Sequence, residues 1–187
     1  MLRAVGGAIA VLGFCALALA ACAAHTQPAR LRLQLSPASF GTAISLQQHL
    51  TVERDGQSSE LEAALEIDPE RIDLVALAMH QRVLSLHYDG RSLQSWRHPA
   101  LPAALRAEDV LEDLQLTLWP VEALRPALPP GWRIEENGAR RILLADERPV
   151  TAIEYSGVPR WLGKIIVHNL RYRYRLTIQS VRTGHQE

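Results

Sequence analysis

The sequence has little lysine and little cysteine. Lys164 is its only lysine, and Cys15 and Cys22 are its only cysteines in 187 residues. Both cysteines lie in the first two dozen residues, so the rest of the chain cannot form a disulfide, use a cysteine nucleophile or bind a metal through thiolates. Acidic and basic residues number 20 each, which gives a formal net charge of zero. Without a basic excess we expect no nucleic-acid partner.

Motifs that carry chemistry are also missing from the sequence. There is no Gly-x-Ser-x-Gly nucleophile elbow and no Gly-rich phosphate loop. The seven histidines show none of the usual metal-ligand spacings. Acidic pairs such as Glu135/Glu136 fit solvated faces or hairpin flanks. We therefore predict a protein that is not an enzyme, with no cofactor and no metal; a dispersed site acting on lipid esters is a less favoured alternative.

The amino-terminal run has the form of an export signal. Residues 4–24 carry no charge, are rich in Ala and Gly, and follow a single arginine. Residues 19–22, Leu-Ala-Ala-Cys, resemble a bacterial lipobox, in which the chain is cut before the cysteine and the cysteine is acylated. We predict a signal peptide over residues 1–21 and lipidation of Cys22. The alternatives are an ordinary cut near Ala24 and an uncleaved span, for which the run is long enough.

The residues around the lipobox also predict where the protein is. An Asp after Cys22 would resemble an inner-membrane retention signal, whereas Ala23 favours the outer membrane. We expect the protein on the periplasmic face of the outer membrane, held by at least two acyl chains, since one anchors only marginally. Residues 22–40 are largely polar without a clear period and predict a flexible tether. Residues 41–184 form the predicted folded domain.

The first half of the domain alternates apolar and polar residues with period two, which is typical of half-buried strands. The segments that show this are 45–53, 60–68, 71–79, 82–88 and 91–97. Asp55-Gly56 and Asp89-Gly90 suit tight turns between strands. Residues 75–79 are apolar on both faces, so they fit either a buried central strand or an exposed contact surface.

The period then changes to that of a helix. The residues at helical spacing are Val110, Leu111, Leu114 and Leu118. Trp119-Pro120 ends or kinks this helix, and a short second helix follows. Strands return after residue 131, with Asn137-Gly138 as a hairpin signal. In the last strand we expect Tyr172, Tyr174, Leu176 and Ile178 to face inward, and Arg171, Arg173, Arg175, Thr177 and Gln179 to face outward.

About nine strands with one helical insertion predict a mainly β fold. Antiparallel strands with one apolar face have to cover that face. We predict a curved antiparallel sheet that forms an incomplete β-barrel covered by short helices. The mouth of such a half-barrel can hold an apolar ligand.

The order of elements resembles that of the outer-membrane lipoprotein receptor LolB and its periplasmic relatives. It is most similar to an uncharacterised Gram-negative lipoprotein family related to that fold. Three stretches carry the resemblance: ALEIDPERIDLVALAMHQRVLSLHYDG, DLQLTLWPVEALRPALPPGW and the closing pair of strands. The resemblance implies a LolA/LolB-like half-barrel with a cavity for acyl chains. Members of the family are often encoded beside fatty-acid-synthase-like enzymes of aryl-polyene lipid pathways.

The resemblance also implies a contact residue. The receptor has an exposed leucine on a loop between two early strands, and Met79 occupies the matching position here. We expect Leu77 and Met79 to contact the membrane or the cargo, although Ala78-Met79-His80 replaces the receptor's Pro-Leu-Gly. The implied partners are the membrane through acylated Cys22, an acyl-chain ligand or lipoprotein cargo, and proteins of an envelope-lipid pathway.

Inward-facing apolar residues are the candidates for the cavity lining. They are Leu50, Val52, Leu65, Ile67, Leu74, Leu84, Leu86, Tyr88, Leu114, Leu118, Trp119, Tyr174 and Leu176. Aromatic residues that fit either a ligand mouth or the core are Tyr88, Trp96, Trp119, Trp132, Tyr155 and Trp161. The main hypothesis is a lipoprotein that binds or hands over an acyl-bearing ligand. The alternative is a non-catalytic assembly or scaffold lipoprotein with a filled core, and an open cavity would distinguish the two.

Overall fold

The computed structural model describes residues 31–102 and 105–183. Its strands are β1 Ile44–Arg54, β2 Gln57–Ile67, β3 Ile72–Ala78, β4 Gln81–Tyr88, β5 Leu93–Arg97, β6 Trp132–Asn137, β7 Arg140–Ala145, β8 Arg148–Tyr155, β9 Gly163–Asn169 and β10 Tyr174–Arg182. The helices are η1 Pro37–Phe40, α1 Ala107–Leu118, α2 Val121–Leu124 and η2 Arg125–Ala127. No helix of these described residues is long and apolar enough to cross a membrane.

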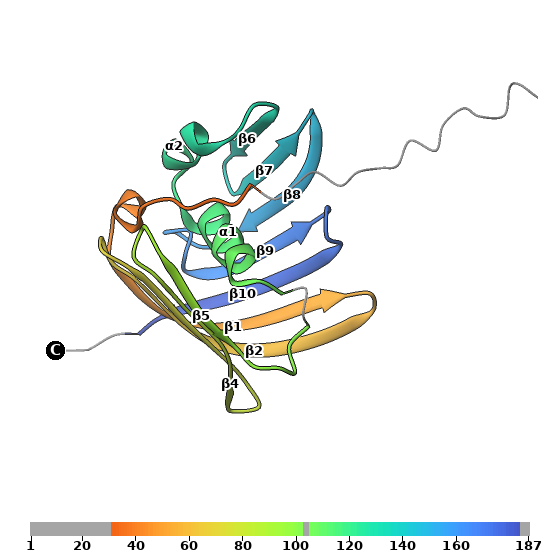
Figure 1. Cartoon of the computed structure of the whole chain (residues 1–187). Helices are drawn as coiled ribbons and strands as arrows, with labels where there is room; N and C mark the ends of the chain where they lie inside the picture. Colours follow the sequence, from red (N-terminus) through yellow and green to blue (C-terminus); the bar gives the residue numbers. More distant parts are fainter. Residues whose placement is uncertain (1–30, 103–104, 184–187) are drawn as a thin grey trace, which may run out of the picture.

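All ten strands belong to one antiparallel sheet in the order β5-β4-β3-β2-β1-β10-β9-β8-β7-β6. The sheet curls strongly around α1 and stays open between β5 and β6 (Figure 1). The predicted fold class, a curved antiparallel sheet forming an incomplete barrel with short helices, is confirmed. The register also agrees with the alternation, because Leu65 lies opposite Leu74 and Ile67 opposite Ile72, all facing the core.

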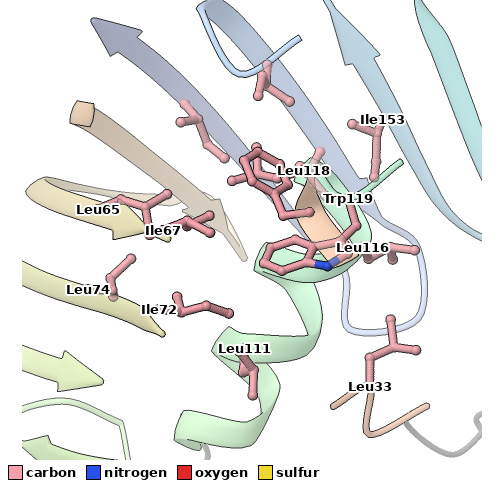
Figure 2. Close-up of a cluster of buried hydrophobic side chains, with 14 of the residues drawn as sticks. Leu33, Leu65, Ile67, Ile72, Leu74, Leu111, Leu116, Leu118, Trp119 and Ile153 are labelled. Carbon is pink, nitrogen blue, oxygen red and sulfur yellow. The ribbon is translucent and has the colours of Figure 1, made fainter. Parts of the chain in front are cut away.

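The helical insertion fills the concave face of the sheet. Figure 2 shows Leu111 and Trp119 pointing toward the same interior as Ile67 and Ile72 from the strands. Pro120 has no N–H to continue the helical hydrogen bonds, so α1 ends at Leu118. Burying each such side chain stabilises the fold by about 1.5–3 kcal/mol, so much of the domain's stability comes from this packing.

Residues 31–40, which we call the strap, do not form the flexible tether that the sequence predicts. Leu33 and Phe40 are buried in the core, and the strap contains the short helix η1. The prediction is wrong for these residues because their few apolar side chains find partners on α1. The remainder of the predicted tether, including Cys22, and the predicted signal peptide lie outside the described residues.

The predicted last strand begins too early. β10 starts at Tyr174, and residues 170–173 form the turn from β9. Arg171, expected to face solvent, is buried and paired with Glu112 of α1. Tyr172, expected to face inward, lies in the turn, half-buried. The alternation continues across the turn in the sequence, so the pattern could not locate the strand boundary.

The half-barrel has two different ends. One, the hairpin end, carries the two-residue turns Asp55-Gly56, Met79-His80 and Asp146-Glu147, with positive φ at every one of these positions. The described chain also begins there, because Arg32 bonds to Glu112 beside the β9–β10 turn. The other, the pocket end, holds the carboxyl terminus of α1, the β6–β7 hairpin and the β8–β9 loop.

Candidate functional site

A cavity of about 570 Å³ opens at the pocket end. Four parts of the chain build it: η1, the segment that joins α1 to α2, the β6–β7 hairpin and the β8–β9 loop. Its lining is mostly apolar, with four charged side chains. The lining residues are Phe40, Leu118, Trp119, Pro120, Val121, Glu122, Glu136, Gly138, Ala139, Arg141, Tyr155, Gly157, Val158, Pro159, Arg160 and Trp161.

Three aromatic rings form one wall of this cavity. Phe40 lies with its ring centroid 5.0 Å from that of Trp119 and 5.4 Å from that of Trp161, and the rings are tilted or edge-on. Such arrangements are favourable beyond the area they bury. The wall is therefore apolar; Phe40 and Trp119 are buried behind it, and Trp161 is the ring of the three that is partly exposed.

Arg141 fixes the end of α1 to the sheet beneath the cavity. Its guanidinium donates from Nη1 to the carbonyl of Leu116 at 2.6 Å and from Nη2 to that of Trp119 at 2.9 Å. The hydroxyl of Tyr155 donates to the carbonyl of Thr117 at 2.8 Å. Carbonyls at a helix carboxyl terminus lack partners within the helix, and the helix dipole favours a cation there. The sheet thus supplies the cap that α1 lacks in its own sequence.

Glu136 joins two arginines at the rim of the cavity. Arg141 donates from Nε to this carboxylate at 2.9 Å, and Arg160 donates to it from the β8–β9 loop. Burial raises the pKa of Glu136, but the hydrogen bonds and charges of Arg160 and Arg141 outweigh it and hold this pKa below its ordinary value. The carboxylate is therefore charged at neutral pH and links the β6–β7 hairpin with the loop.

Tyr155 lies under both guanidinium groups. The carbon at the centre of the Arg160 group is 5.0 Å from its ring centroid, and that of Arg141 is 5.7 Å away. Burial raises the pKa of Tyr155 to about 12, although the two positive charges oppose the shift. The phenol stays protonated and donates its hydrogen bond at any physiological pH, so it is a support and not an acid or base.

The β8–β9 loop forms the outer lip of the cavity. Its shape requires Gly157, since a Cβ there would lie 1.8 Å from the carbonyl oxygen of Leu162. Val158, next in the chain, is 98% exposed. An apolar side chain held in solvent by a tight loop, beside an apolar cavity, is available to a ligand or a surface.

Most of the predicted cavity residues do not line a cavity. Packed in the core are Leu65, Ile67, Leu74, Leu84, Leu86, Tyr88, Leu118 and Trp119; half-buried are Leu50, Val52, Leu114, Tyr174 and Leu176. Only Leu118 and Trp119 line the observed cavity. The concave face is filled because α1 and the strap insert their own side chains into it.

The aromatic candidates divide between the two interpretations. Trp119, Tyr155 and Trp161 line the cavity, whereas Tyr88 is buried in the core. Trp96 is exposed on the convex face, with Arg82 stacked 4.5 Å from its ring centroid, and Trp132 is half-buried. The sequence analysis did not identify Phe40, Glu136, Arg141 or Arg160 as site residues. The signals available in the sequence were the segments Trp119-Pro120 and 159–161 (Pro-Arg-Trp), which place aromatic residues beside prolines.

The predicted contact residues, Leu77 and Met79, lie at the hairpin end, which is the end of the half-barrel opposite the cavity. Met79 is 90% exposed and Leu77 is 36% exposed, so the interpretation of residues 75–79 as a buried central strand is wrong. Both central residues of the turn, Met79 and His80, have positive φ, at 47° and 63°. Such turns favour Asn-Gly, so the exposed methionine is not there for turn stability.

No group of three or more metal-ligating side chains occurs in the described parts of the chain. Two histidines of the sheet surface instead pair with single carboxylates, His49 with Glu62 and His87 with Asp73. Lipidation of Cys22 remains a prediction, since that residue lies outside the described residues.

The chain belongs to a protein family described as "Protein of unknown function (DUF3261)", whose model matches residues 45–182. Among curated proteins there is no significant match.

Several solved structures are similar in part. They include a chain of the Pseudomonas aeruginosa MucA/MucB complex (17% identity, TM-score 0.44, covering 82% of this chain and 56% of that one) and MucB (16%, TM-score 0.39, covering 80% and 55%). A DUF1329 family protein from Desulfovibrio piger ATCC 29098 has 10% identity and a TM-score of 0.33, covering 84% of this chain and 92% of that one. The chain spans little more than half the length of the first two.

Proposed function

We propose that this DUF3261 protein is a non-catalytic binding protein that accepts an acyl-bearing ligand, a lipid or a lipoprotein, at the pocket end of its half-barrel. The single observation that carries this proposal is the cavity of about 570 Å³ with its wall of aromatic rings. Ligand sites are typically concave, mostly apolar and equipped with a few polar groups that orient the ligand. This cavity has that composition.

The charges at the rim constrain the ligand. Glu122 and Glu136 balance Arg141 and Arg160 among the lining residues. A hydrocarbon chain gains about 25 cal/mol for each Å² that it removes from water, while its polar head meets a rim with no net charge. The aromatic wall also suits a ligand with an aryl or conjugated group, such as an aryl-polyene-type envelope lipid, which the family resemblance suggests.

The protein would work while tethered to a membrane. Acylated Cys22 would anchor it at the periplasmic face of the outer membrane, and the described chain begins nine residues later at the hairpin end. Met79 and Leu77 protrude from the same end. An apolar side chain kept in a turn that would be more stable with Asn-Gly fits a contact with lipid or cargo. In this proposal the anchor, the contact residues and the pocket all take part in transferring the acyl-bearing ligand.

Blocking the pocket tests the proposal. Ala139 is exposed in the β6–β7 hairpin and lines the cavity, so Ala139→Trp fills space without disturbing the core. Ala64→Trp, at an exposed position of β2, is the matched control. Both variants of the full chain are titrated with the fluorescent fatty acid cis-parinaric acid. We expect about a tenfold or greater loss of affinity for Ala139→Trp only; equal binding by both variants and the wild type would contradict the pocket assignment.

A scaffold role is the second candidate, and the packing of the concave face favours it. The sheet interior beneath α1 is filled by side chains of the protein itself. The convex face of β3–β5 exposes Val75, Leu77 and Trp96, with Arg82 stacked on the tryptophan. Such a patch suits an envelope-lipid pathway protein. A Trp96→Glu variant that loses a cross-linked partner in its own host, yet still binds cis-parinaric acid, would support this role.

A further inference from the structure

The strap runs beside the second half of α1, and hydrogen bonds join the two from Arg32 to Ser39. The backbone N–H of Arg32 donates to Glu112 Oε2 at 2.8 Å. Three residues on, the N–H of Leu35 donates to Gln115 Oε1 at 3.0 Å, and Gln115 Nε2 donates back to the Leu35 carbonyl at 2.9 Å. Both α1 side chains are buried. The strap therefore replaces solvent as the partner of the polar groups on α1.

The same contact continues to the pocket. Trp119 Nε1 donates to the hydroxyl of Ser39 at 2.9 Å, and Phe40 packs on both Trp119 and Trp161. Phe40 thus ends the strap and forms part of the cavity wall. Moving the strap would remove a wall of the pocket and the hydrogen-bond partners of α1 in a single step.

The β9–β10 turn and the sheet hold α1 through polar groups at several points. At the hairpin end the buried Glu112 accepts a hydrogen bond from Arg171 at 3.0 Å, and the hydroxyl of Tyr174 donates to Asp113. At the pocket end Arg141 caps the last carbonyls. Between these points the strap binds Gln115, while the apolar side of α1 faces the sheet.

We infer that the strap is a clamp that controls access to the concave face. With the strap seated, α1 stays over the apolar interior and the pocket is shallow. With the strap displaced, Phe40 leaves the wall, and an acyl chain extends from the pocket into the space beneath α1. This inference rests on the proposed function and adds its regulation: the segment nearest the membrane end of the chain opens the site.

Hydrogen exchange tests the clamp without any ligand. Gln115→Ala in the full chain removes both bonds to Leu35 and leaves the apolar face of α1 intact. We expect amide exchange in residues 107–118 to become about tenfold faster or more, with the strands unchanged. Glu108→Gln, on α1 and hydrogen-bonded to Arg106 rather than to the strap backbone, is the control. Unchanged protection of α1, or faster exchange throughout the sheet, would overturn the clamp.

Cross-linking tests whether the clamp governs uptake. Leu35→Cys and Gln115→Cys are combined in a full chain with Cys15→Ser and Cys22→Ser, so that the introduced thiols are the only ones. One sample is joined by a short bis-maleimide and the other is capped with N-ethylmaleimide. We expect cis-parinaric acid uptake to be about tenfold slower or more in the joined form.

The outcomes separate the two claims. Equal uptake by the joined and capped forms would overturn the clamp while the proposed function stands. Absence of uptake by both forms and by the wild type would refute the proposed function, and the exchange experiment would still decide whether the strap holds α1.

Discussion

Each end of the half-barrel has a glutamate that is paired with arginine, but the pair at one end is fully buried and the pair at the other is partly exposed. At the hairpin end Glu112 and Arg171 are both fully buried, and the carboxylate also accepts the backbone N–H of Arg32. At the pocket end Glu136 is 17% exposed and joins buried Arg141 to Arg160, which is 34% exposed. The Glu112–Arg171 pair joins α1 to the β9–β10 turn inside the core. The Glu136–Arg160 pair lies at the rim of the cavity, where it is partly exposed to solvent.

The difference indicates which ion pair supports the fold and which lies where a ligand can bind. A fully buried ion pair is costly to open, because its charges lose their partner in the core. At the rim, the contact of Glu136 with the partly exposed Arg160 can be exchanged for water or a ligand head at lower cost than its contact with the buried Arg141. Stability should therefore depend more on the Glu112–Arg171 pair than on the Glu136–Arg160 contact, and ligand binding should depend on the pocket end.

The largest effect is expected from breaking the buried pair. Glu112→Ala removes the buried carboxylate that accepts a hydrogen bond from Arg171 and should destabilise the fold by about 3–5 kcal/mol. Chemical denaturation followed by circular dichroism measures this loss. Glu108→Ala, on the same helix in a more exposed position, should cost less than about 1 kcal/mol. Similar losses in the two variants would contradict the structural role of the hairpin end.

The rim pair should have a smaller effect that depends on pH. The pKa of Glu136 is lowered in the folded protein, so its stabilising contribution is present above the ordinary Glu pKa of about 4.3 and is lost as the pH falls through the lower folded value. Glu136→Gln should destabilise the protein by about 1–3 kcal/mol at pH 7 and weaken its dependence on pH below about 4.3.

Thermal unfolding between pH 7 and pH 3 measures this dependence. Glu60→Gln, on an exposed strand face, serves as the comparison. If Glu136→Gln reproduced the full acid-induced loss of the wild type, the carboxylate would not be the group that titrates at the rim.

The smallest effect is a gain in stability at the Met79-His80 turn. Both residues adopt positive φ, which Asn and Gly tolerate better. The double change Met79→Asn with His80→Gly should stabilise the protein by about 0.5–1 kcal/mol and reduce its transfer to lipid vesicles. A destabilised variant would show that Met79 supports the turn, and unchanged transfer would show that it makes no contact.

The strand pattern made most of the fold predictable. Alternation assigned the inward faces of β1–β4 correctly, and the helical spacing of Leu111 and Leu118 located α1. These assignments succeed because period two and period 3.6 each place apolar residues on one face. The strap was missed because its apolar residues are few and irregular, and they become ordered only by packing on α1.

The site was much less predictable. Inward residues such as Leu74 and Tyr88 could be named, but whether they line a cavity or contact other side chains depends on what fills the barrel. Glu136 and Arg160 are separated by 24 positions, so no local pattern connects them. The polar residues Glu112 and Gln115 break the apolar stripe of α1, and only the strap and Arg171 explain their burial.

The most direct test of the binding role is native mass spectrometry of the protein purified from its own host. The account predicts that the wild type and Ala64→Trp carry an acyl-bearing molecule, and that Ala139→Trp carries little or none. Wild-type protein that is free of ligand and also fails to take up cis-parinaric acid would contradict the account, as would equal loading of Ala139→Trp.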